Sequence, residues 1–282
     1  MNDAQNPAVT RLAHALRPEA GPALGVFLPA GFPNWTAGID LLHSFAQRGA
    51  GVLEVGVPAT SPVLDGPAIS AAYDQALRQG VRMTHVMSTV RHAAESGAPV
   101  VVMSYWSSVS AYGVQRFADD LATAGAAGAM IPDLPLASMA PWLAAARTAG
   151  ISTPQFIPRD VSDTDLSRLG AAASGWMYAP AVAAATGYQG ALDLTGMQHF
   201  TRRLRSHAQH PLVAGIGIST PARARAIAPL VDGVVIGSPI VRPLLEQPGK
   251  PGHAQAMARV RQFTEALRDA APLPHPRSTA SP

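Results

Sequence analysis

The 282-residue chain is hydrophobic at 48% of its positions and charged at 14%, so it can form a large core and is not intrinsically disordered over most of its length. Its net charge of +3 comes without a basic run, which gives no indication of nucleic-acid binding. The lack of cysteine excludes disulfides, cysteine-ligated metals and thiol nucleophiles. The single lysine, Lys250, lies in a turn-like stretch of proline and glycine, which argues against Schiff-base chemistry.

Neither a secretion signal nor a membrane span is predicted. The first residues lack a basic segment followed by an apolar one. No apolar run reaches the roughly 18 to 20 residues that a membrane span requires. We therefore expect a cytoplasmic protein.

Short apolar segments alternate with amphipathic segments of helical length, which is typical of βα units and a parallel sheet. The predicted strands occupy residues 25–28, 52–57, 100–105, 129–131, 153–157, 176–179, 212–216 and 233–236. The predicted helices occupy residues 38–48, 84–96, 114–124, 137–149, 163–173, 192–206 and 221–228. Eight such strands predict a TIM (β/α)8 barrel, with an extra N-terminal helix at residues 9–16.

Helix starts along the chain carry their own capping signals. Ser162 with Asp165 resembles a capping box, and Thr220 and Ser238 each stand as an N-cap hydroxyl before a proline. The main alternative is a doubly wound sheet, but no G-x-G-x-x-G motif opens a helix after the first strand. We expect one barrel domain over residues 1–271 and a flexible C-terminal tail at 272–282.

Three polar residues stand at the carboxyl ends of the predicted strands, where barrel active sites form. Glu54 lies within an apolar strand, which is costly unless the carboxyl group is paired or used; a structural carboxylate satisfied by hydrogen bonds is the alternative. Asp65 lies on the loop after the same strand. It is either a catalytic residue or part of an Asp-Gly turn. Tyr178 ends the sixth strand, where core packing is the alternative to catalysis.

A phosphate site is indicated by the ends of the last two strands. Residues 215–219 read GIGIS after the seventh strand, and Gly237 and Ser238 follow the eighth strand and open a helix. Free backbone N–H groups and the helix dipole at such an end bind a dianion. Glycines that only form tight βα turns are the alternative interpretation.

No metal site is predicted. The nearest histidines, His207 and His210, precede the seventh strand at the opposite end of the barrel from the expected site. Three aspartates near residue 163 lack the glycine and glutamate of a calcium loop and are interpreted as a helix start. Five arginines are interpreted as solvated surface residues: Arg202, Arg203, Arg205, Arg223 and Arg225.

The sequence between residues 25 and 241 resembles the α subunit of tryptophan synthase. The matching segments are FLPAGFP at 27–33, LEVGVP at 53–58, DGP at 65–67, MSYW at 103–106, YG at 112–113, IPDLP at 131–135, TG at 186–187, GIGIS at 215–219 and GS at 237–238. The resemblance implies a TIM barrel that splits indole-3-glycerol phosphate into indole and glyceraldehyde 3-phosphate by a retro-aldol step, without a metal or cofactor.

The same resemblance implies roles for individual residues. Glu54 would be the general acid/base that moves protons between the substrate hydroxyl and indole C3, and Asp65 would accept the indole N–H. Tyr178 would assist near the reacting centre. The other implied site residues are Phe27, Met103, Tyr105 and Thr186 in the substrate pocket, and Gly187, Gly217, Gly237 and Ser238 at the phosphate.

Three loops depart from the family pattern. Residues 58–62 read PATSP where the family usually has PFSDP, and residues 181–187 read AVAAATG where the family usually has SRxGVTG. Residues 107–108 are two serines in place of Asn-Pro. Because the first two loops close over the substrate and communicate with the β subunit in the family, these changes put a β-like partner in doubt more than the chemistry.

Several functions are therefore open. The leading hypothesis is an indole-3-glycerol phosphate lyase, either stand-alone or dependent on a β-like subunit. One alternative is a barrel that acts on another phosphorylated or prenylated substrate in specialised metabolism. In the two altered loops, alanine and valine stand where the family has phenylalanine and arginine, which opens space and removes charge. Another alternative is a non-catalytic activator of a β-like partner. Retention of Glu54 and Asp65 argues against that role, because two carboxylates in an apolar cleft reduce stability.

Overall fold

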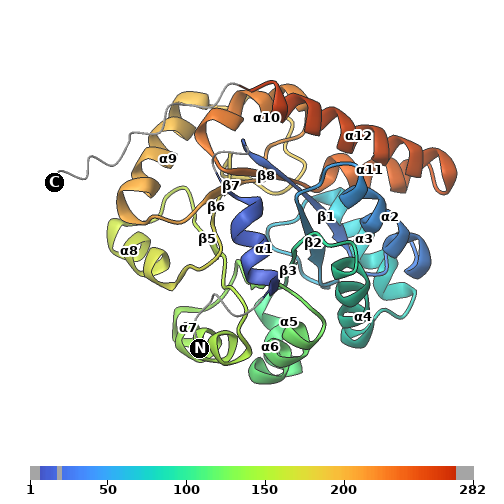
Figure 1. Ribbon diagram of the computed structural model, residues 1–282, viewed down its shortest axis with the longest axis horizontal. Coiled ribbons are helices and arrows are strands. Elements are labelled where there is room, and N and C mark those ends of the chain that lie inside the picture. Colours follow the sequence, from blue (N-terminus) through green and yellow to red (C-terminus); the bar gives the residue numbers. More distant parts are fainter. Residues whose placement is uncertain (1–6, 18–20, 271–282) are drawn as a thin grey trace.

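Eight parallel strands form the centre of the computed structural model, which describes residues 7–17 and 21–270. They are hydrogen-bonded in the order β4-β3-β2-β1-β8-β7-β6-β5. A parallel bridge between Gly128 of β4 and Ser152, which precedes β5, brings the two ends of the sheet together in a nearly closed barrel, as the TIM-barrel prediction requires (Figure 1). The strands are β1 Ala23–Pro29, β2 Val52–Gly56, β3 Val100–Met103, β4 Gly128–Met130, β5 Gln155–Phe156, β6 Met177–Ala179, β7 Leu212–Ala214 and β8 Gly233–Ile236.

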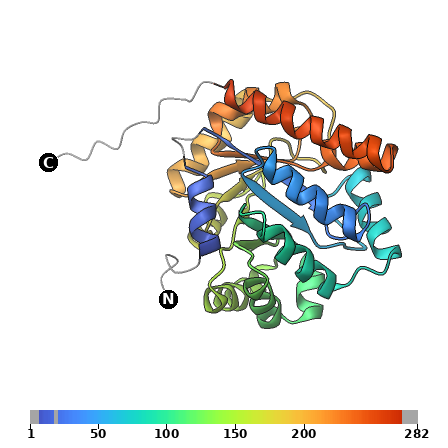
Figure 2. The same ribbon diagram turned by 45° about the vertical axis from the view of Figure 1, so that its right-hand side comes forward.

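Helices surround the strands in both views (Figures 1 and 2). The helices that overlap predicted ranges are α1 Pro7–Ala15, α2 Trp35–Gln47, α4 Met83–Ala94, α6 Val114–Thr123, α7 Leu136–Ala149, α8 Asp163–Ala172, α9 Leu194–His207 and α10 Pro221–Ile227, the last followed by the short 3-10 helix η3 Ala228–Leu230. The predicted tail at residues 272–282 lies outside the described residues.

Four helices lie outside the predicted ranges. They are α3 Pro67–Arg78, α5 Trp106–Tyr112, α11 Ser238–Glu246 and α12 Lys250–Arg268. Helix α3 buries Ile69, Ala72, Tyr73 and Ala76, which is a helical spacing, but the alanines weaken the apolar contrast along the sequence. The turn-like stretch expected at residues 247–252 is a turn only up to Gly249, because the exposed Lys250 is the first residue of α12.

Two of the predicted helix caps are formed. The Ser162 hydroxyl accepts a hydrogen bond from the Asp165 N–H at 3.1 Å and donates to the Asp165 carboxylate at 2.8 Å. The Thr220 hydroxyl accepts from the Arg223 N–H at 3.3 Å. The start of α8 is therefore a capped helix end, which accounts for its aspartates.

The third predicted cap was wrong. Helix α11 begins at Ser238 itself, and Gly237 is the N-cap residue. The Ser238 hydroxyl is buried without a hydrogen-bond partner among the described residues. The helix start therefore leaves a free hydroxyl at the carboxyl end of β8, in addition to its backbone N–H groups.

The opposite end of the barrel is covered by α1, the extra N-terminal helix. Its buried Leu12, and Leu16 just beyond the helix, contact the backbone near Gly175 and Gly233, where a Cβ would lie 3.3 Å from Leu12 Cδ2 and 3.1 Å from Leu16 Cδ2. Glycine at these two positions lets α1 pack close to the strands. No helix in the described part of the chain is both long and apolar enough to cross a membrane.

Of the five arginines interpreted as solvated surface residues, Arg202, Arg205 and Arg225 are exposed, whereas Arg203 and Arg223 are only partly exposed and bind backbone carbonyls. Arg205 donates to the Asp232 carboxylate at 3.1 Å, and Asp232, only 6% exposed, also accepts from the Leu212 N–H at 2.7 Å. This pair fixes the start of β7, because a buried carboxylate needs such partners. Arg223 binds backbone carbonyls of two loops, as described below.

Candidate active site

A pocket opens at the carboxyl end of the barrel, where βα loops of TIM barrels carry function. Seven of the eight strands contribute a side chain to its lining: Phe27, Glu54, Met103, Met130, Phe156, Tyr178 and Val235. The β2–α3, β4–α7, β6–α9, β7–α10 and β8–α11 loops and the first turns of α3 and α11 provide the remaining lining. All predicted site residues except Tyr105 line this pocket.

Glu54 is the more deeply buried of the two carboxyl groups in the pocket. It sits on β2 between Phe27 of β1 and Val101 of β3 in the sheet register, and it is 3% exposed. Burial, and secondarily the negative charge of Asp65, raise the pKa of Glu54 to about 8. At neutral pH the side chain is therefore mostly a protonated acid, which can donate a proton.

Asp65 is held in a different environment from Glu54. The Tyr105 hydroxyl donates to Asp65 Oδ2 at 2.8 Å, and the Thr186 hydroxyl lies 3.4 Å from Oδ1. Burial raises the pKa of Asp65 to about 6, against the opposing effect of these two hydrogen bonds. At neutral pH Asp65 is mostly ionised, so the pocket holds one neutral acid and one carboxylate.

The Asp-Gly pair at 65–66 is not explained by turn chemistry. Gly66 has φ −83°, which any residue can adopt. A Cβ at this position would lie 2.0 Å from the Thr186 carbonyl oxygen, so a side chain cannot fit. The Gly66 N–H donates to Thr186 Oγ1 at 2.8 Å, and the Thr186 N–H donates to the Leu64 carbonyl at 3.0 Å. The glycine brings the β6–α9 loop against the loop that carries Asp65.

Tyr105 supports Asp65 from behind instead of lining the pocket. The hydroxyl is the donor to the carboxylate and the acceptor of the Leu64 N–H at 3.1 Å. Burial and the charge of Asp65 raise the pKa of Tyr105, so it stays a neutral donor. The pocket role expected for Tyr105 is therefore corrected to that of a residue that orients Asp65.

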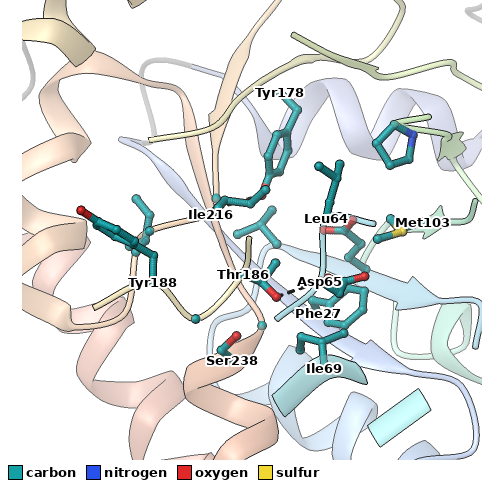
Figure 3. A pocket seen from close by; sticks show the side chains of 18 of the residues that line it. Phe27, Leu64, Asp65, Ile69, Met103, Tyr178, Thr186, Tyr188, Ile216 and Ser238 are labelled. Atoms are coloured by element: carbon teal, nitrogen blue, oxygen red, sulfur yellow. Dashed lines mark hydrogen bonds between the residues drawn. The ribbon is translucent and has the colours of Figure 1, made fainter. Parts of the chain in front are cut away.

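Tyr178 lies at the inner wall of the pocket, on β6 (Figure 3). Its hydroxyl accepts a hydrogen bond from the Ile216 N–H at 3.0 Å, and its ring stacks on Phe156 with centroids 5.7 Å apart. Burial and the nearby Glu54 raise the pKa of Tyr178, which makes it a donor and not a base. It both packs the core and presents an O–H near Glu54.

The other end of the pocket is built from backbone and hydroxyl groups. Gly187 and Gly217 have φ angles of +84° and +100°, which favour glycine. Ser219 and Ser238 each have a buried hydroxyl oxygen without a partner among the described residues. In Figure 3, Thr186 lies between Ser238 and the Asp65 side chain, so the two ends are distinct. Free donors at a helix start suit an anion.

Sequence reasoning missed several residues of this site. Arg242, one turn after Ser238 on α11, places its Nη2 3.8 Å from where a Cβ of Gly187 would stand. No lysine or arginine lines the pocket itself among the residues described. The i, i+4 spacing from Ser238 could have revealed Arg242, had α11 been given bounds. Tyr73 has a fully buried hydroxyl without a described partner, and the charge of Asp65 contributes to raising its pKa.

No three histidine, aspartate or glutamate side chains of the described residues are grouped as metal ligands. Together, the barrel and its pocket define a TIM-barrel enzyme site with a neutral acid and a carboxylate at one end and free donors at the other.

Comparison with known proteins identifies the family. The family model of the tryptophan synthase alpha chain matches residues 14–272, so the chain belongs to the tryptophan synthase alpha chain family. The tryptophan synthase alpha chain of Streptomyces coelicolor is 40% identical over 235 residues, covering 83% of this chain and 86% of that protein. The chain from Streptomyces avermitilis is 41% identical over 233 residues, covering 82% and 84%.

Solved structures give the same result. A chain of Mycobacterium tuberculosis tryptophan synthase superimposes with a TM-score of 0.82 and 30% identity, covering 93% of this chain and 97% of that one. The tryptophan synthase subunit alpha of Legionella pneumophila superimposes with a TM-score of 0.83 and 25% identity, covering 94% and 99%. The resemblance predicted from the sequence motifs is confirmed.

Proposed function

We propose that this protein cleaves indole-3-glycerol phosphate into indole and glyceraldehyde 3-phosphate by a retro-aldol reaction. The observation that carries the proposal is the pair Glu54 and Asp65 in one pocket, with pKa values raised to about 8 and about 6. Such a pair supplies a proton donor and a negative charge at the same pH. Family membership supports the same reaction.

In the proposed reaction Glu54 acts first as an acid. Protonated Glu54 transfers its proton to indole C3, which places a positive charge on the ring nitrogen. The Asp65 carboxylate accepts the indole N–H and stabilises that charge. The apolar lining strengthens this interaction, because apolar side chains screen charges less than water does.

Glu54 then acts as a base. Its carboxylate removes the proton from the hydroxyl of the carbon attached to C3. The bond between that carbon and C3 breaks, the carbon becomes the aldehyde of glyceraldehyde 3-phosphate, and the electron pair returns to the indole ring. Glu54 regains the proton it gave up, so the residue is unchanged after one turnover.

The apolar residues of the pocket suit the flat indole ring. Phe27, Leu64, Ile69 and Met103 come from four different segments and lie around the Asp65 end (Figure 3). Burial of an aromatic ring against such side chains is favourable, and a few polar groups fix its orientation. Tyr178 is proposed to assist near the reacting hydroxyl as a neutral donor.

The phosphate is proposed to bind at the other end. Gly187, Gly217, Gly237 and Ser238 would offer backbone N–H groups and a hydroxyl, and the start of α11 adds its dipole. Arg242 adds a positive charge beside Gly187. The free hydroxyl of Ser238 supports this assignment, because a buried donor without a partner is costly unless a ligand uses it.

A β-like subunit is proposed as a partner on the same face, and a cytoplasmic location is part of the proposal. Three large apolar residues are exposed on carboxyl-end loops or helix starts: Val63 at 69%, Leu136 at 61% and Leu194 at 42%. Exposed apolar side chains on this face could be covered by such a partner. A catalytic subunit is favoured over a non-catalytic activator, because the acid and the carboxylate are both retained in the pocket.

The test is indole release from indole-3-glycerol phosphate by the isolated protein, with and without a β subunit. We expect Glu54→Gln to lower kcat by about 10² to 10⁴, since the amide cannot transfer the proton. Glu95→Gln is the matched control, because Glu95 is exposed at the end of α4, outside the pocket, and its carboxylate pairs with His92 among the described residues. Absence of indole from well-folded wild type under both conditions would contradict the proposal.

A further inference from the structure

Arg223 connects the two loops that form the anion end of the pocket. It lies on α10, and its guanidinium donates to four backbone carbonyls. Nη1 donates to Gly217 at 2.9 Å and to Tyr188 at 3.2 Å. Nη2 donates to Gln189 at 3.0 Å and also to Gly190. One side chain thus holds together the β6–α9 and β7–α10 loops.

The residues bound by Arg223 adjoin the site on both loops. Gly217 lines the pocket, and Tyr188 lines it directly after Thr186 and Gly187. On its inner side the β6–α9 loop is held by the hydrogen bonds of Thr186 with Leu64 and Gly66. Arg223 supplies the corresponding attachment on the outer side, so the segment that carries Thr186 and Gly187 is held at two points.

The stretch before Thr186 is held by its backbone and by small apolar contacts. Residues 181–185 are Ala-Val-Ala-Ala-Ala; Ala181 is buried and its N–H donates to the Ile216 carbonyl at 3.1 Å, but the side chains of the stretch carry no hydrogen-bonding groups. Val182 packs against the glycine of the neighbouring loop, where a Cβ at Gly217 would meet Val182 Cγ2 at 2.8 Å. Further along the loop, the carbonyls of Tyr188, Gln189 and Gly190 accept hydrogen bonds from Arg223, a donor outside the loop.

The chemistry of arginine suits this position. A guanidinium has five N–H donors in a fixed plane and can bind several carbonyls at once, whereas an ammonium is a single point. No aspartate or glutamate pairs with Arg223 among the described residues, so its donors are directed to the two loops. Arg225, on the same helix, is exposed and instead pairs with Asp269 at 3.0 Å.

We propose that Arg223 is a positioning residue that holds the β6–α9 loop over the pocket, with Thr186 and Gly187 in place for the substrate and its phosphate. The expected effect on kinetics rests on the proposed lyase function. The expected effect on the loop does not depend on that function, because it concerns only contacts within the chain.

Two readouts test the proposal. The first is cleavage by chymotrypsin after Tyr188, a partly exposed aromatic residue of this loop. The second is steady-state kinetics of indole-3-glycerol phosphate cleavage. The variants are Arg223→Met, which removes the donors, Arg223→Lys, which keeps the charge, and Arg225→Met as the matched control from the same helix.

We expect Arg223→Met to speed cleavage after Tyr188 and to raise KM by about tenfold or more, with a smaller change in kcat, because the loss is one of binding geometry. For both the rate of cleavage after Tyr188 and KM, Arg223→Lys should lie between Arg223→Met and wild type. Arg225→Met should match wild type in both. Inorganic phosphate should slow cleavage of wild type more than that of Arg223→Met. Thermal unfolding of each variant identifies any global loss of structure.

The outcomes separate the two proposals. Unchanged cleavage after Tyr188 and unchanged KM in Arg223→Met would overturn the positioning role. If wild type makes no indole but Arg223→Met is cleaved faster, the lyase function fails while the role of Arg223 in holding the loop stands.

Discussion

The two ends of the pocket are built in different ways. At the chemical end, Glu54, Phe27 and Met103 come from strands, and Asp65 is a loop residue whose carboxylate is held by the Tyr105 and Thr186 hydroxyls. At the anion end, the groups are backbone N–H donors and hydroxyls of loops and of one helix start, which other residues must hold in place. The chemistry thus relies mainly on buried strand side chains with one anchored loop carboxylate, whereas anion binding depends on the attachment of loops.

The difference extends to electrostatics. Desolvation dominates at the chemical end and raises the pKa of both Glu54 and Asp65. Only Asp65 has hydrogen-bond donors to offset it, which separates the two pKa values. The anion end has free donors and the nearby Arg242. A substrate with an aromatic ring and a phosphate would satisfy both ends at once.

The largest expected effect is a loss of kcat from a substitution at the chemical end. We expect Asp65→Asn to lower kcat by about 10² to 10³, because the amide cannot stabilise a positive charge on the indole nitrogen. The measurement is single-turnover indole formation at saturating substrate. Asp74→Asn, on α3 and outside the pocket, serves as the control. A kcat within twofold of wild type would show that Asp65 is not a charge stabiliser.

At the anion end we expect a smaller effect, mainly on binding. Ser238→Ala should raise KM by about tenfold with little change in kcat, because one hydrogen bond to a charged group is lost. Without ligand the variant should be at least as stable as wild type, since the free hydroxyl is buried without a partner. A large kcat loss with unchanged KM would place Ser238 in the chemistry instead.

A further effect concerns stability and not catalysis. The pKa of Glu54 is raised above its unfolded value of 4.5, so its contribution to folding is present below pH 4.5 and is lost as pH rises towards 8. Between pH 4.5 and pH 8, one such group lowers the free energy of unfolding by about 1.4 kcal/mol for each pH unit. Glu54→Gln should remove this slope, and its gain in melting temperature over wild type should grow from pH 5 to pH 8. An equal gain at both pH values would contradict the raised pKa.

The two ends also differ in how far the sequence predicts them. A glutamate inside an apolar strand is a strong signal, because burial of a carboxyl group is costly, and Glu54 lies where the pattern indicates. The barrel follows from the alternation of strand and helix patterns, although alanine-rich α3 and polar α12 were not recognised.

Loop contacts are harder to predict because they depend on residues far apart in the chain. The close approach of Gly66 to Thr186 spans 120 positions, and the bonds of Arg223 to the β6–α9 loop span more than 30. Arg223 has the pattern of a surface residue, and Ser238 has the pattern of an N-cap. Each finds its contacts only after the strands bring the loops together.

The most direct test of the account is the pH dependence of kcat/KM for indole-3-glycerol phosphate cleavage. The reaction requires Asp65 ionised and Glu54 protonated, so kcat/KM should rise through about pH 6 and fall through about pH 8. The acid limb should disappear in Asp65→Asn while the alkaline limb stays. A flat profile from pH 5 to pH 9 in wild type, or an acid limb that persists in Asp65→Asn, would contradict the account.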